Sequence, residues 1–387
     1  MSKKKSFNGF TTFIVGVISL VLGVVVGFTS FAYLNPPKPS DVYVSGDLSI
    51  HFMELGNNYT GDSVYIKAGD TDILIDAGSR SNSSTAISQY INNYVTDNKL
   101  EYVIATHAHQ DHIAGFAGDN TNKSIFELYE CETIIDFALT DNTSTKLYKN
   151  YVIKRDAEVE KGAKHYTALQ CWNNTDGASR KYVLSDGIEM EILYNYYYEN
   201  KSNDENNYSV CVMINQGDKH FLFTGDLEKE GEQKLVEHNS LPQVEVFKAG
   251  HHGSKTSSND CLLSVIKPKV VCVCCCAGSV EYSGKNATSE LTDIDAFKEY
   301  MKNTFPTQDF INRVAKYTDK VYVTTLGTIF YNTEKGAYRD NGYGSMNGNI
   351  VVTSNRSELT ITCSNNNTYL KDTEWFIKNR VTPAEWA

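Results

Sequence analysis

The segment THAHQDH, residues 106–112, places three histidines and one aspartate within six residues. It directly follows a short apolar run of the kind that forms a strand. If the segment stays extended, its side chains alternate, and His107, His109 and Asp111 lie on one side. His112 joins them only if the chain turns there. Neutral imidazole and carboxylate oxygen are ligands that Zn, Mn or Fe accepts, so the spacing predicts a metal site at a strand end.

Apolar segments end in residues of the same ligand types at three further places, namely Asp76, Asp226 and the pair His251-His252. A carboxylate beside a metal-bound histidine usually accepts the second N–H of that ring. We assign this role to Asp76; the alternative is a side chain that caps a turn. Glycines flank the two histidines and let the backbone approach an ion or substrate closely.

Strands and helices alternate along the chain, which predicts an α/β protein whose strand ends carry these ligands. We expect strands at residues 48–54, 63–68, 72–76, 102–105, 133–137, 188–193, 209–215, 219–224, 244–247, 270–276, 321–324, 328–331, 349–353 and 359–363. We expect helices at residues 84–100, 124–129, 145–161, 227–238, 259–266 and 289–302.

The combination of HxHxDH, then TGD, then HHGS resembles the metallo-β-lactamase superfamily. Within it, the sequence is most similar to the hydrolase domain of ComEC-type DNA-internalisation proteins and their stand-alone secreted relatives. The resemblance spans roughly residues 49–331 and is carried by residues 73–78 (ILIDAG), 106–115 (THAHQDHIAG), 206–210 (NNYSV), 222–226 (LFTGD) and 246–258 (VFKAGHHGSKTSS). It implies an αββα sandwich with a two-metal site at one sheet edge.

The resemblance also implies roles for individual residues and two divalent ions, Zn or Mn. One ion would be held by His107 and His109, the other by Asp111, His112 and His251, with Asp226 bridging them. Hydroxide bound between the ions would be the nucleophile, with Asp111 and Asp226 as the catalytic carboxylates. The residues expected to support these ligands or to contact substrate are Asp76, Asn207, His252, Ser254 and Lys255.

The sequence departs from the superfamily pattern at the first ion. Many members supply a third histidine to it from a strand between HxHxDH and the bridging aspartate, and only His165 and His220 lie in that interval. Neither is well placed, and Asn207 and Ser209 stand in the aligned segment. We therefore expect the first site to be open or weakly occupied.

The first 47 residues predict a membrane attachment. Lysines at positions 3 to 5 precede 25 uncharged residues, 10–34, which is long enough to span a bilayer. The positive charge predicts a cytoplasmic N-terminus at residues 1–9 and a single pass, with the catalytic domain extracellular. A cleaved signal peptide is the alternative and would make the protein secreted. Residues 35–47 contain three prolines and are expected to form a stiff spacer.

The remainder divides into a hydrolase domain at residues 48–331 and a β-rich C-terminal extension at residues 332–387, which we expect to close a sheet edge rather than form a separate unit. The formal charge is −11, and removing the three cytoplasmic lysines leaves −14 outside the membrane. An acidic domain lacks the broad basic surface of most nucleic-acid-binding proteins. Nucleic acid is therefore expected only as a substrate.

Five of the nine cysteines lie between residues 261 and 276. Residues 270–276 (VVCVCCC) predict a buried strand in which cysteine serves as a small apolar residue, because neighbours on a strand cannot all reach one ion. The sequence does not decide whether Cys131 and Cys171 form a disulfide. The tyrosines among residues 194–198 are either an aromatic cage for a quaternary ammonium group or ordinary loop residues.

These observations favour a membrane-anchored extracellular metallohydrolase that cleaves a phosphodiester, either in DNA or in a cell-wall polymer of choline-phosphate type. The substrate would be a small molecule or a polymer. One span cannot form a transport channel, so a DNA-uptake role does not follow from the resemblance. A lactone, amide or thioester hydrolase is the enzymatic alternative, and a binding module with a degraded site is the non-enzymatic one.

Overall fold

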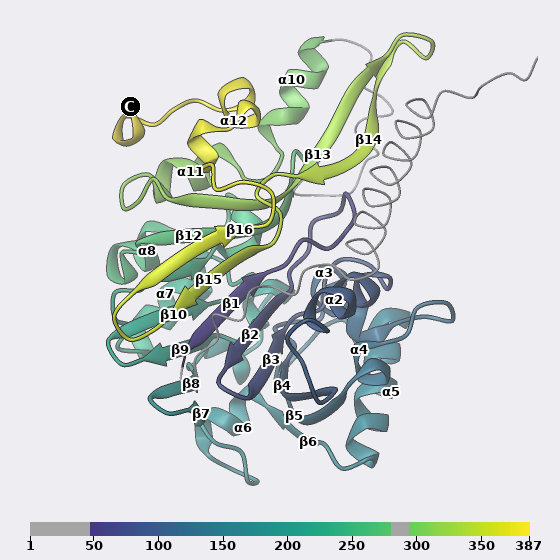
Figure 1. Ribbon diagram of the computed structural model, residues 1–387, viewed down its shortest axis with the longest axis vertical. Coiled ribbons are helices and arrows are strands. Elements are labelled where there is room, and N and C mark those ends of the chain that lie inside the picture. Colours follow the sequence, from purple (N-terminus) through teal and green to yellow (C-terminus); the bar gives the residue numbers. More distant parts are fainter. Residues whose placement is uncertain (1–46, 280–293) are drawn as a thin grey trace, which may run out of the picture. The chain divides into compact units, whose positions relative to one another are not determined.

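The computed structural model describes residues 47–279 and 294–387 (Figure 1). The expected anchor at residues 10–34 and nearly all of the spacer lie outside these residues. Across the described ranges, no helix combines the length and the apolar character needed to cross a bilayer.

Two eight-stranded mixed sheets form the centre of the fold. The first has the order β16-β15-β1-β2-β3-β4-β5-β6, with β1 at Leu48–Phe52, β2 at Val64–Ala68, β3 at Thr71–Ile75, β4 at Lys99–Ile104, β5 at Glu130–Asp136, β6 at Lys164–Thr167, β15 at Ile350–Ser354 and β16 at Leu359–Cys363. The second has the order β14-β13-β12-β11-β10-β9-β8-β7, with β7 at Lys181–Ser185, β8 at Ile188–Ile192, β9 at Val212–Gln216, β10 at Lys219–Phe223, β11 at Val246–Lys248, β12 at Val270–Ala277, β13 at Val321–Asn332 and β14 at Ala337–Ser345. Strands β3 to β6 run parallel, as do β10 to β13.

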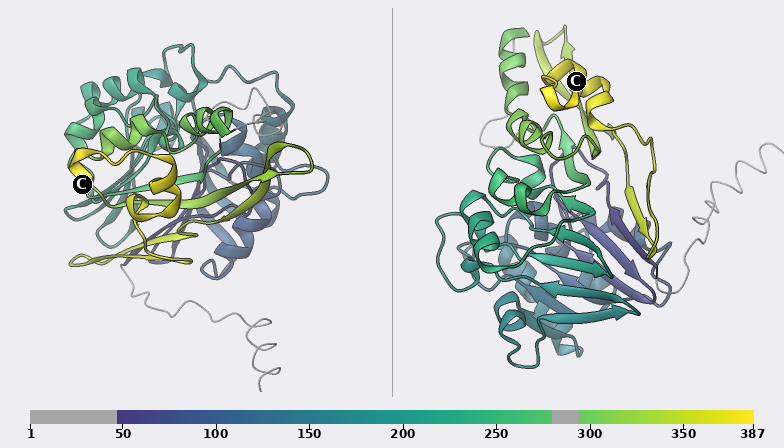
Figure 2. Two further views of the ribbon diagram at one scale, coloured as in Figure 1. Left: turned by 90° about the horizontal axis from the view of Figure 1, so that it is seen from above. Right: turned by 90° about the vertical axis from the view of Figure 1, so that its left-hand side faces the viewer.

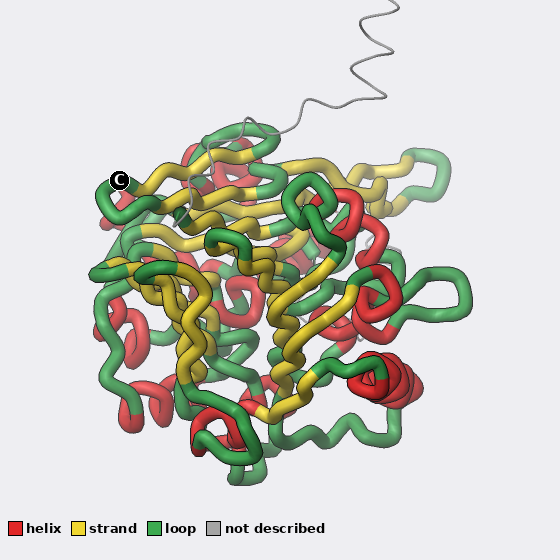
Figure 3. The backbone as a smooth tube through the Cα atoms, turned by 60° about the horizontal axis from the view of Figure 1, so that its bottom comes forward, coloured by secondary structure: helices red, strands yellow, loops and turns green. Residues whose placement is uncertain are grey.

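The sheets pack face to face, with helices outside them (Figure 2; helices red in Figure 3). The rings of Phe52 on β1 and Phe223 on β10 stack across the interface, with centroids 6.2 Å apart. The α-helices are α2 at Ser83–Ile91, α3 at Gln110–Ala117, α4 at Ile125–Leu128, α5 at Lys146–Glu160, α6 at Ala168–Asn173, α7 at Lys229–His238, α8 at Asp260–Ile266, α10 at Ile294–Lys302, α11 at Gln308–Val314 and α12 at Glu374–Asn379. This arrangement confirms the expected α/β sandwich.

Every residue of β12 is buried, as predicted for a central strand. Cys272 and Cys274 face the core between the sheets, while Val273 and Cys275 face the helices that cover the second sheet. All nine cysteines are free thiols, so Cys131 and Cys171 are not linked. The alternation explains how a cysteine-rich strand serves packing, because each small side chain fills one of two apolar layers.

The absence of disulfides gives a testable expectation. Burial raises the pKa of Cys261 and of Cys363 to about 11, and the other seven cysteines are more deeply buried. With the native protein at neutral pH, a thiol reagent should react only at these two positions, about 100-fold more slowly than with a free thiol of pKa near 8.5. Nine thiols should react after denaturation. A fall in melting temperature on adding dithiothreitol would contradict the expectation.

Several predicted boundaries are wrong. The helix expected at residues 84–100 ends at Ile91, because residues 99–104 form β4 and pair with β5. The two strands expected at residues 321–324 and 328–331 are one continuous strand, β13. Strands β6, β7 and β14 were not predicted, since none of their sequences shows a clear apolar alternation. Strands β15 and β16 extend the first sheet by pairing on β1, and the tail after residue 369 is helical.

Candidate metal centre

Parallel strands bring the ligand-type residues to one edge of the sandwich. Asp76 follows β3 and the HxHxDH segment follows β4, while Asp226 follows β10 and His251-His252 follow β11. The carboxyl ends of neighbouring parallel strands meet at the same sheet edge, which is where open α/β folds place their sites.

The HxHxDH segment is extended only as far as His109, so His107 and His109 face each other as expected, while Asp111 and His112 reach the site through the turn that the sequence required for His112. Strand β4 ends at Ile104, and α3 begins at Gln110 with His109 as its N-cap residue. Asp111 and His112 therefore lie on the first turn of a helix. That helix packs directly on the residues after β3, because a Cβ atom at Gly115 would lie 2.4 Å from the carbonyl oxygen of Ala77.

His112 lies between two carboxylates. Its Nδ1 is 2.7 Å from Asp76 Oδ2, and its Nε2 is 3.0 Å from Asp226 Oδ2. Asp76 is fixed in turn by the backbone N–H and the hydroxyl of Thr106, each at 2.8 Å. Burial lowers the pKa of His112, but the charges of Asp226 and Asp76 outweigh burial and raise it well above the usual value. Asp76 thus makes the contact predicted for it and leaves Nε2 facing the site.

His252 is oriented in the same way. Its Nδ1 donates to the carbonyl oxygen of Cys274 at 2.9 Å, so the lone pair of a neutral ring lies on Nε2. That Nε2 is 3.2 Å from Asp111 Oδ2 and 3.2 Å from Asp226 Oδ2. The Nε2 of His251 is farther away, 3.8 Å from Asp226 Oδ2, while its Nδ1 contacts Thr256 Oγ1 at 3.1 Å. The geometry therefore favours His252 over His251 as a ligand, and the choice between them stays a prediction.

The loop that carries these histidines holds strained backbone. His251 and His252 have φ values of 46° and 55°, and Asp76 has a φ of 59°. Left-handed conformations of residues other than glycine are costly and concentrate at functional sites. Three of the eight non-glycine residues with positive φ in the described part of the chain therefore lie where ligand-type side chains converge.

The donor set fits a divalent cation. The ligand-type atoms of Asp62, His112, Asp226 and His252 all lie within 4.8 Å of one another, the one such cluster among residues 47–279 and 294–387. Asp226 Oδ1 is buried and accepts no hydrogen bond. A buried carboxylate oxygen without a donor is costly unless a cation neutralises it. Imidazole with carboxylate is a set that Zn or Mn accepts.

A known protein family matches both stretches of the chain that supply this cluster. The model described as the metallo-beta-lactamase superfamily matches residues 56–118 and 204–277, which contain every residue of the cluster. The chain belongs to the metallo-β-lactamase superfamily.

Among curated superfamily relatives, ComE operon protein 3 of Bacillus subtilis is 27% identical over 184 residues, which is 45% of this chain and 20% of that protein. Competence protein ComA of Neisseria gonorrhoeae is 25% identical over 210 residues, 54% of this chain and 25% of that protein. The chain therefore spans only a fifth to a quarter of these relatives. A solved structure, the metallo-beta-lactamase fold protein YhfI from Bacillus subtilis, is 12% identical with a TM-score of 0.33, covering 52% of this chain and 70% of that one.

Asp62 and Lys248 are the members of the cluster that sequence reasoning missed. Lys248 is 3% exposed and forms an ion pair with Asp62, and its Nζ is 3.8 Å from Asp226 Oδ1. Asp62 Oδ1 lies 3.0 Å from His252 Nδ1. Because Asp62 already neutralises a buried ammonium, we assign the fourth ligand position to Asp111, whose Oδ2 faces the lone-pair nitrogen of His252. Metal ligation by these residues stays a prediction.

The first superfamily site is incomplete in this structure. His107 Nε2 and His109 Nδ1 are 3.0 Å apart, a separation close to that of two ligands on one ion. The other side of His107 meets hydroxyl groups, with Ser209 Oγ 3.4 Å from its Nδ1. His165 pairs with Asp136 and His220 with Asn215, so neither of them supplies a third imidazole.

The remaining predicted contact residues hold the loops around the site. Asn207 accepts the backbone N–H of Glu228 and donates to Ser202. Ser254 is buried, and its hydroxyl accepts the backbone N–H of Thr256. Lys255 lines a neighbouring cavity. These contacts give Asn207 and Ser254 a role in loop structure, while their predicted contact with substrate stays a prediction.

Arg313 and Glu232 both hold the loop after the two histidines. Arg313 donates to the carbonyl oxygens of Ser254, Lys255, Ser257 and Ser258. The carboxylate of Glu232 accepts the backbone N–H groups of Ser258 and Asn259. These hydrogen bonds hold the histidine loop in one conformation, as preorganised metal ligands require.

Substitution of Asp76 tests the orientation of His112. Asparagine tolerates the left-handed backbone at this position, so Asp76→Asn should fold while losing the charge that holds the ring. Removing such a partner typically costs about 10-fold to 100-fold in metal affinity. Competition with a chromophoric zinc chelator measures the change. The matched control is Asp70→Asn, an exposed turn residue, which should bind as the parent does. Equal affinities for all three proteins would rule out the orienting role.

Proposed function

We propose that this metal-dependent hydrolase cleaves a phosphodiester. The observation that carries the proposal is the convergence of two oriented imidazole nitrogens on the carboxylates of Asp111 and Asp226. A bound divalent ion would supply Lewis acidity for a phosphoryl oxygen and would lower the pKa of a water molecule.

The chain's own residues hold protons and charges in place. Asp76 keeps a proton on Nδ1 of His112, and the carbonyl of Cys274 keeps one on Nδ1 of His252. Both Nε2 atoms are thereby left to accept a cation. Asp111 lies beside this cluster and is 32% exposed, whereas the carboxylates of Asp62 and Asp226 are almost fully buried, so Asp111 is the one that substrate and water can reach. We infer that Asp111 orients the attacking water.

The tyrosines among residues 194–198 give no support to a choline ligand. The hydroxyl of Tyr198 is buried and accepts the backbone N–H of Cys211. Tyr194 packs against Trp172 and donates to Glu199, and Tyr197 donates to Glu230. An aromatic cage needs rings that face one cavity, whereas these rings pack on one another and on His238. We therefore favour a nucleic-acid phosphodiester over a choline-phosphate polymer.

The comparisons support this choice in a limited way. Two relatives are named ComE operon protein 3 and competence protein ComA, in line with the resemblance to DNA-internalisation proteins. We propose that the N-terminal segment anchors the protein in the membrane with the catalytic domain outside. Protease treatment of intact cells should then remove the domain, and its full protection would contradict the placement.

The proposed activity is tested with the full-length protein in detergent, loaded with Mn or Zn. Bis(p-nitrophenyl) phosphate should be hydrolysed faster than p-nitrophenyl phosphate or a lactone, and Asp111→Asn should reduce the rate at least about 100-fold. Hydrolysis of lactone alone would establish the alternative superfamily activity. If the protein binds metal stoichiometrically but hydrolyses none of these substrates, the result would support the alternative of a binding module.

A further inference from the structure

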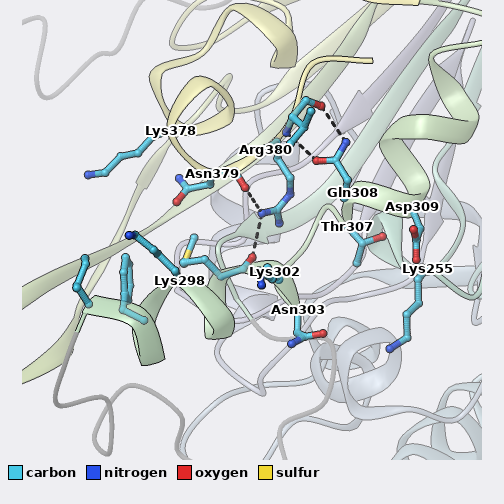
Figure 4. A pocket seen from close by; sticks show the side chains of 14 residues that line it. Lys255, Lys298, Lys302, Asn303, Thr307, Gln308, Asp309, Lys378, Asn379 and Arg380 are labelled. Carbon is cyan, nitrogen blue, oxygen red and sulfur yellow. Dashed lines mark hydrogen bonds between the residues drawn. The ribbon is translucent and has the colours of Figure 1, made fainter. Parts of the chain in front are cut away.

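A cavity of about 660 Å³ lies beside the histidine loop. It is formed by α10, the segment before and into α11, the end of α12, and Lys255 (Figure 4). This volume falls within the range of about 300 to 1,000 Å³ that is usual for ligand sites. No role assigned above uses it.

The cavity is basic on an acidic protein. Five cationic side chains and one carboxylate, Asp309, line it, whereas the whole chain carries −11; the cationic residues are Lys255, Lys298, Lys302, Lys378 and Arg380. Within the part of the chain that the structure describes, Lys298 and Lys302 pair with exposed acids of their own helix, and such pairs neutralise charge weakly. Lys378 has no ion pair among the described residues. A concave surface of one charge sign attracts ligands of the opposite sign.

Arg380 adds a buried charge, and no carboxylate in residues 47–279 and 294–387 forms an ion pair with it. It is 8% exposed, and its guanidinium donates to the carbonyl oxygens of Met301, Thr304, Pro306 and Asn379 and to the Thr304 hydroxyl. Burial lowers the pKa of Arg380 to about 10, so it stays protonated at neutral pH. Its partners among the described residues are neutral, namely these oxygens and the ring of Trp375, 4.5 Å from the guanidinium carbon. The side chain therefore contributes a fixed positive potential to the cavity wall, and an anion there would offset the cost of its burial.

Apolar groups line the same cavity. Phe297 and Met301 contribute to it from α10, and the exposed side chains of Ile294 and Val381 border it. The Phe297 ring stacks on Tyr338 with centroids 4.2 Å apart, which fixes its orientation. Cations beside an apolar and aromatic surface are the pattern by which proteins hold single-stranded nucleic acid, with phosphates on the cations and bases on the rings.

The cavity shares a wall with the metal centre. Thr307, which lines the cavity, donates its backbone N–H and its hydroxyl to the carbonyl oxygen of Gly253. The ring of Phe305 packs against the rings of His251 and His252, with centroids 6.1 Å and 5.7 Å away. A chain cleaved at the metal centre would thus pass close to this cavity.

We propose that the cavity binds a single-stranded nucleic-acid segment adjacent to the phosphodiester that is cleaved. The lysines contact its phosphates, and the apolar surface contacts a base. This inference rests on the proposed function and adds a substrate-binding site to it. A duplex would leave the apolar surface unused, because its bases face inward.

The test compares two triple variants of the full-length protein that lose the same charge. Lys298, Lys302 and Lys378 are replaced by alanine in one, and in the other the exposed Lys146, Lys149 and Lys164, on α5 and β6, are replaced. Binding of a fluorescein-labelled 12-nucleotide oligothymidylate is measured by anisotropy with EDTA present. The cavity variant should bind at least about 10-fold more weakly, and the slope of log K against log salt should fall by up to about 2. The control variant should change neither quantity by a comparable amount.

Catalysis gives a second readout. For the oligonucleotide, the cavity variant should raise KM with kcat retained, and its rate with bis(p-nitrophenyl) phosphate should be unchanged. If the parent protein hydrolyses no diester, the proposed function fails while the anisotropy result still decides the binding site. Equal weakening in both triple variants overturns the site. Tighter binding of poly(glycerol phosphate), which has the charges without bases, overturns the nucleic-acid assignment.

Discussion

Replacing His252 by alanine should abolish stoichiometric metal binding, whereas replacing His251 should not. The Nε2 of His252 lies 3.2 Å from both Asp111 Oδ2 and Asp226 Oδ2. A residue that merely supports a ligand typically contributes 10-fold to 100-fold in affinity, so loss of a ligand should cost at least about 100-fold. Hydrolysis of the diester should fall in parallel, since the carboxylates would no longer share a cation.

His251→Ala is a closely matched control. Both histidines have positive φ values, 46° and 55°, so alanine introduces a similar backbone strain at either position. Both also lie on the same loop and contact Phe305. Ion content by mass spectrometry and affinity by chelator competition distinguish the variants. The reverse order, with His251→Ala losing the ion, would restore the assignment that the superfamily pattern suggested.

The same geometry predicts that metal affinity rises with pH. Burial lowers the pKa of His252, but Asp226 and Asp62 raise it well above the usual value. The pKa of His112 is likewise raised well above its usual value. A protonated ring cannot bind an ion, so each ring must release a proton when the metal binds. Affinity should therefore increase as pH rises towards the pKa values of these rings. In Asp76→Asn the proton on His112 is held less strongly, so this dependence should shift to lower pH.

Sequence patterns predict the site residues that directly follow apolar strands. Asp76, the HxHxDH segment, Asp226 and the histidine pair each come after such a strand, and strand direction alone brings them together. The sequence does not show the turn after His109 or the left-handed backbone at His252, since both are imposed by packing of α3 and by the loop's carbonyl and carboxylate contacts. The choice between His251 and His252 depends on those torsions.

Asp62 escaped prediction for a different reason. It precedes β2, which is antiparallel to β3, so the start of β2 lies at the same edge as the end of β3. A search confined to residues that follow strands cannot find it. The basic cavity is harder still to predict from the sequence. It forms only where α10, α11 and α12 meet, and no local pattern relates residue 255 to residues 298 and 380.

Lys248→Met should destabilise the metal-free protein by about 3 to 5 kcal/mol. The ammonium is 3% exposed, pairs with Asp62, and donates to the carbonyl oxygen of Gly225 at 3.3 Å. Methionine preserves the length of the side chain, so the variant removes charge with little change in volume. Asp62 would then lose the ammonium that pairs with it and keep the ring of His252 as its cationic neighbour, and removing one partner of a buried pair is costly. Urea unfolding in EDTA measures the loss.

A double substitution separates charge from packing. Lys248→Met combined with Asp62→Asn should recover a large part of the loss, because neither a buried ammonium nor its partner carboxylate then remains. The control is Lys154→Met, which breaks the half-exposed pair with Glu127 and should cost below about 1 kcal/mol. If Lys248→Met costs no more than this control, Asp62 does not depend on the ammonium. Asp62 would then be free to serve as a metal ligand, and adding Zn should stabilise Lys248→Met more than it stabilises the parent protein.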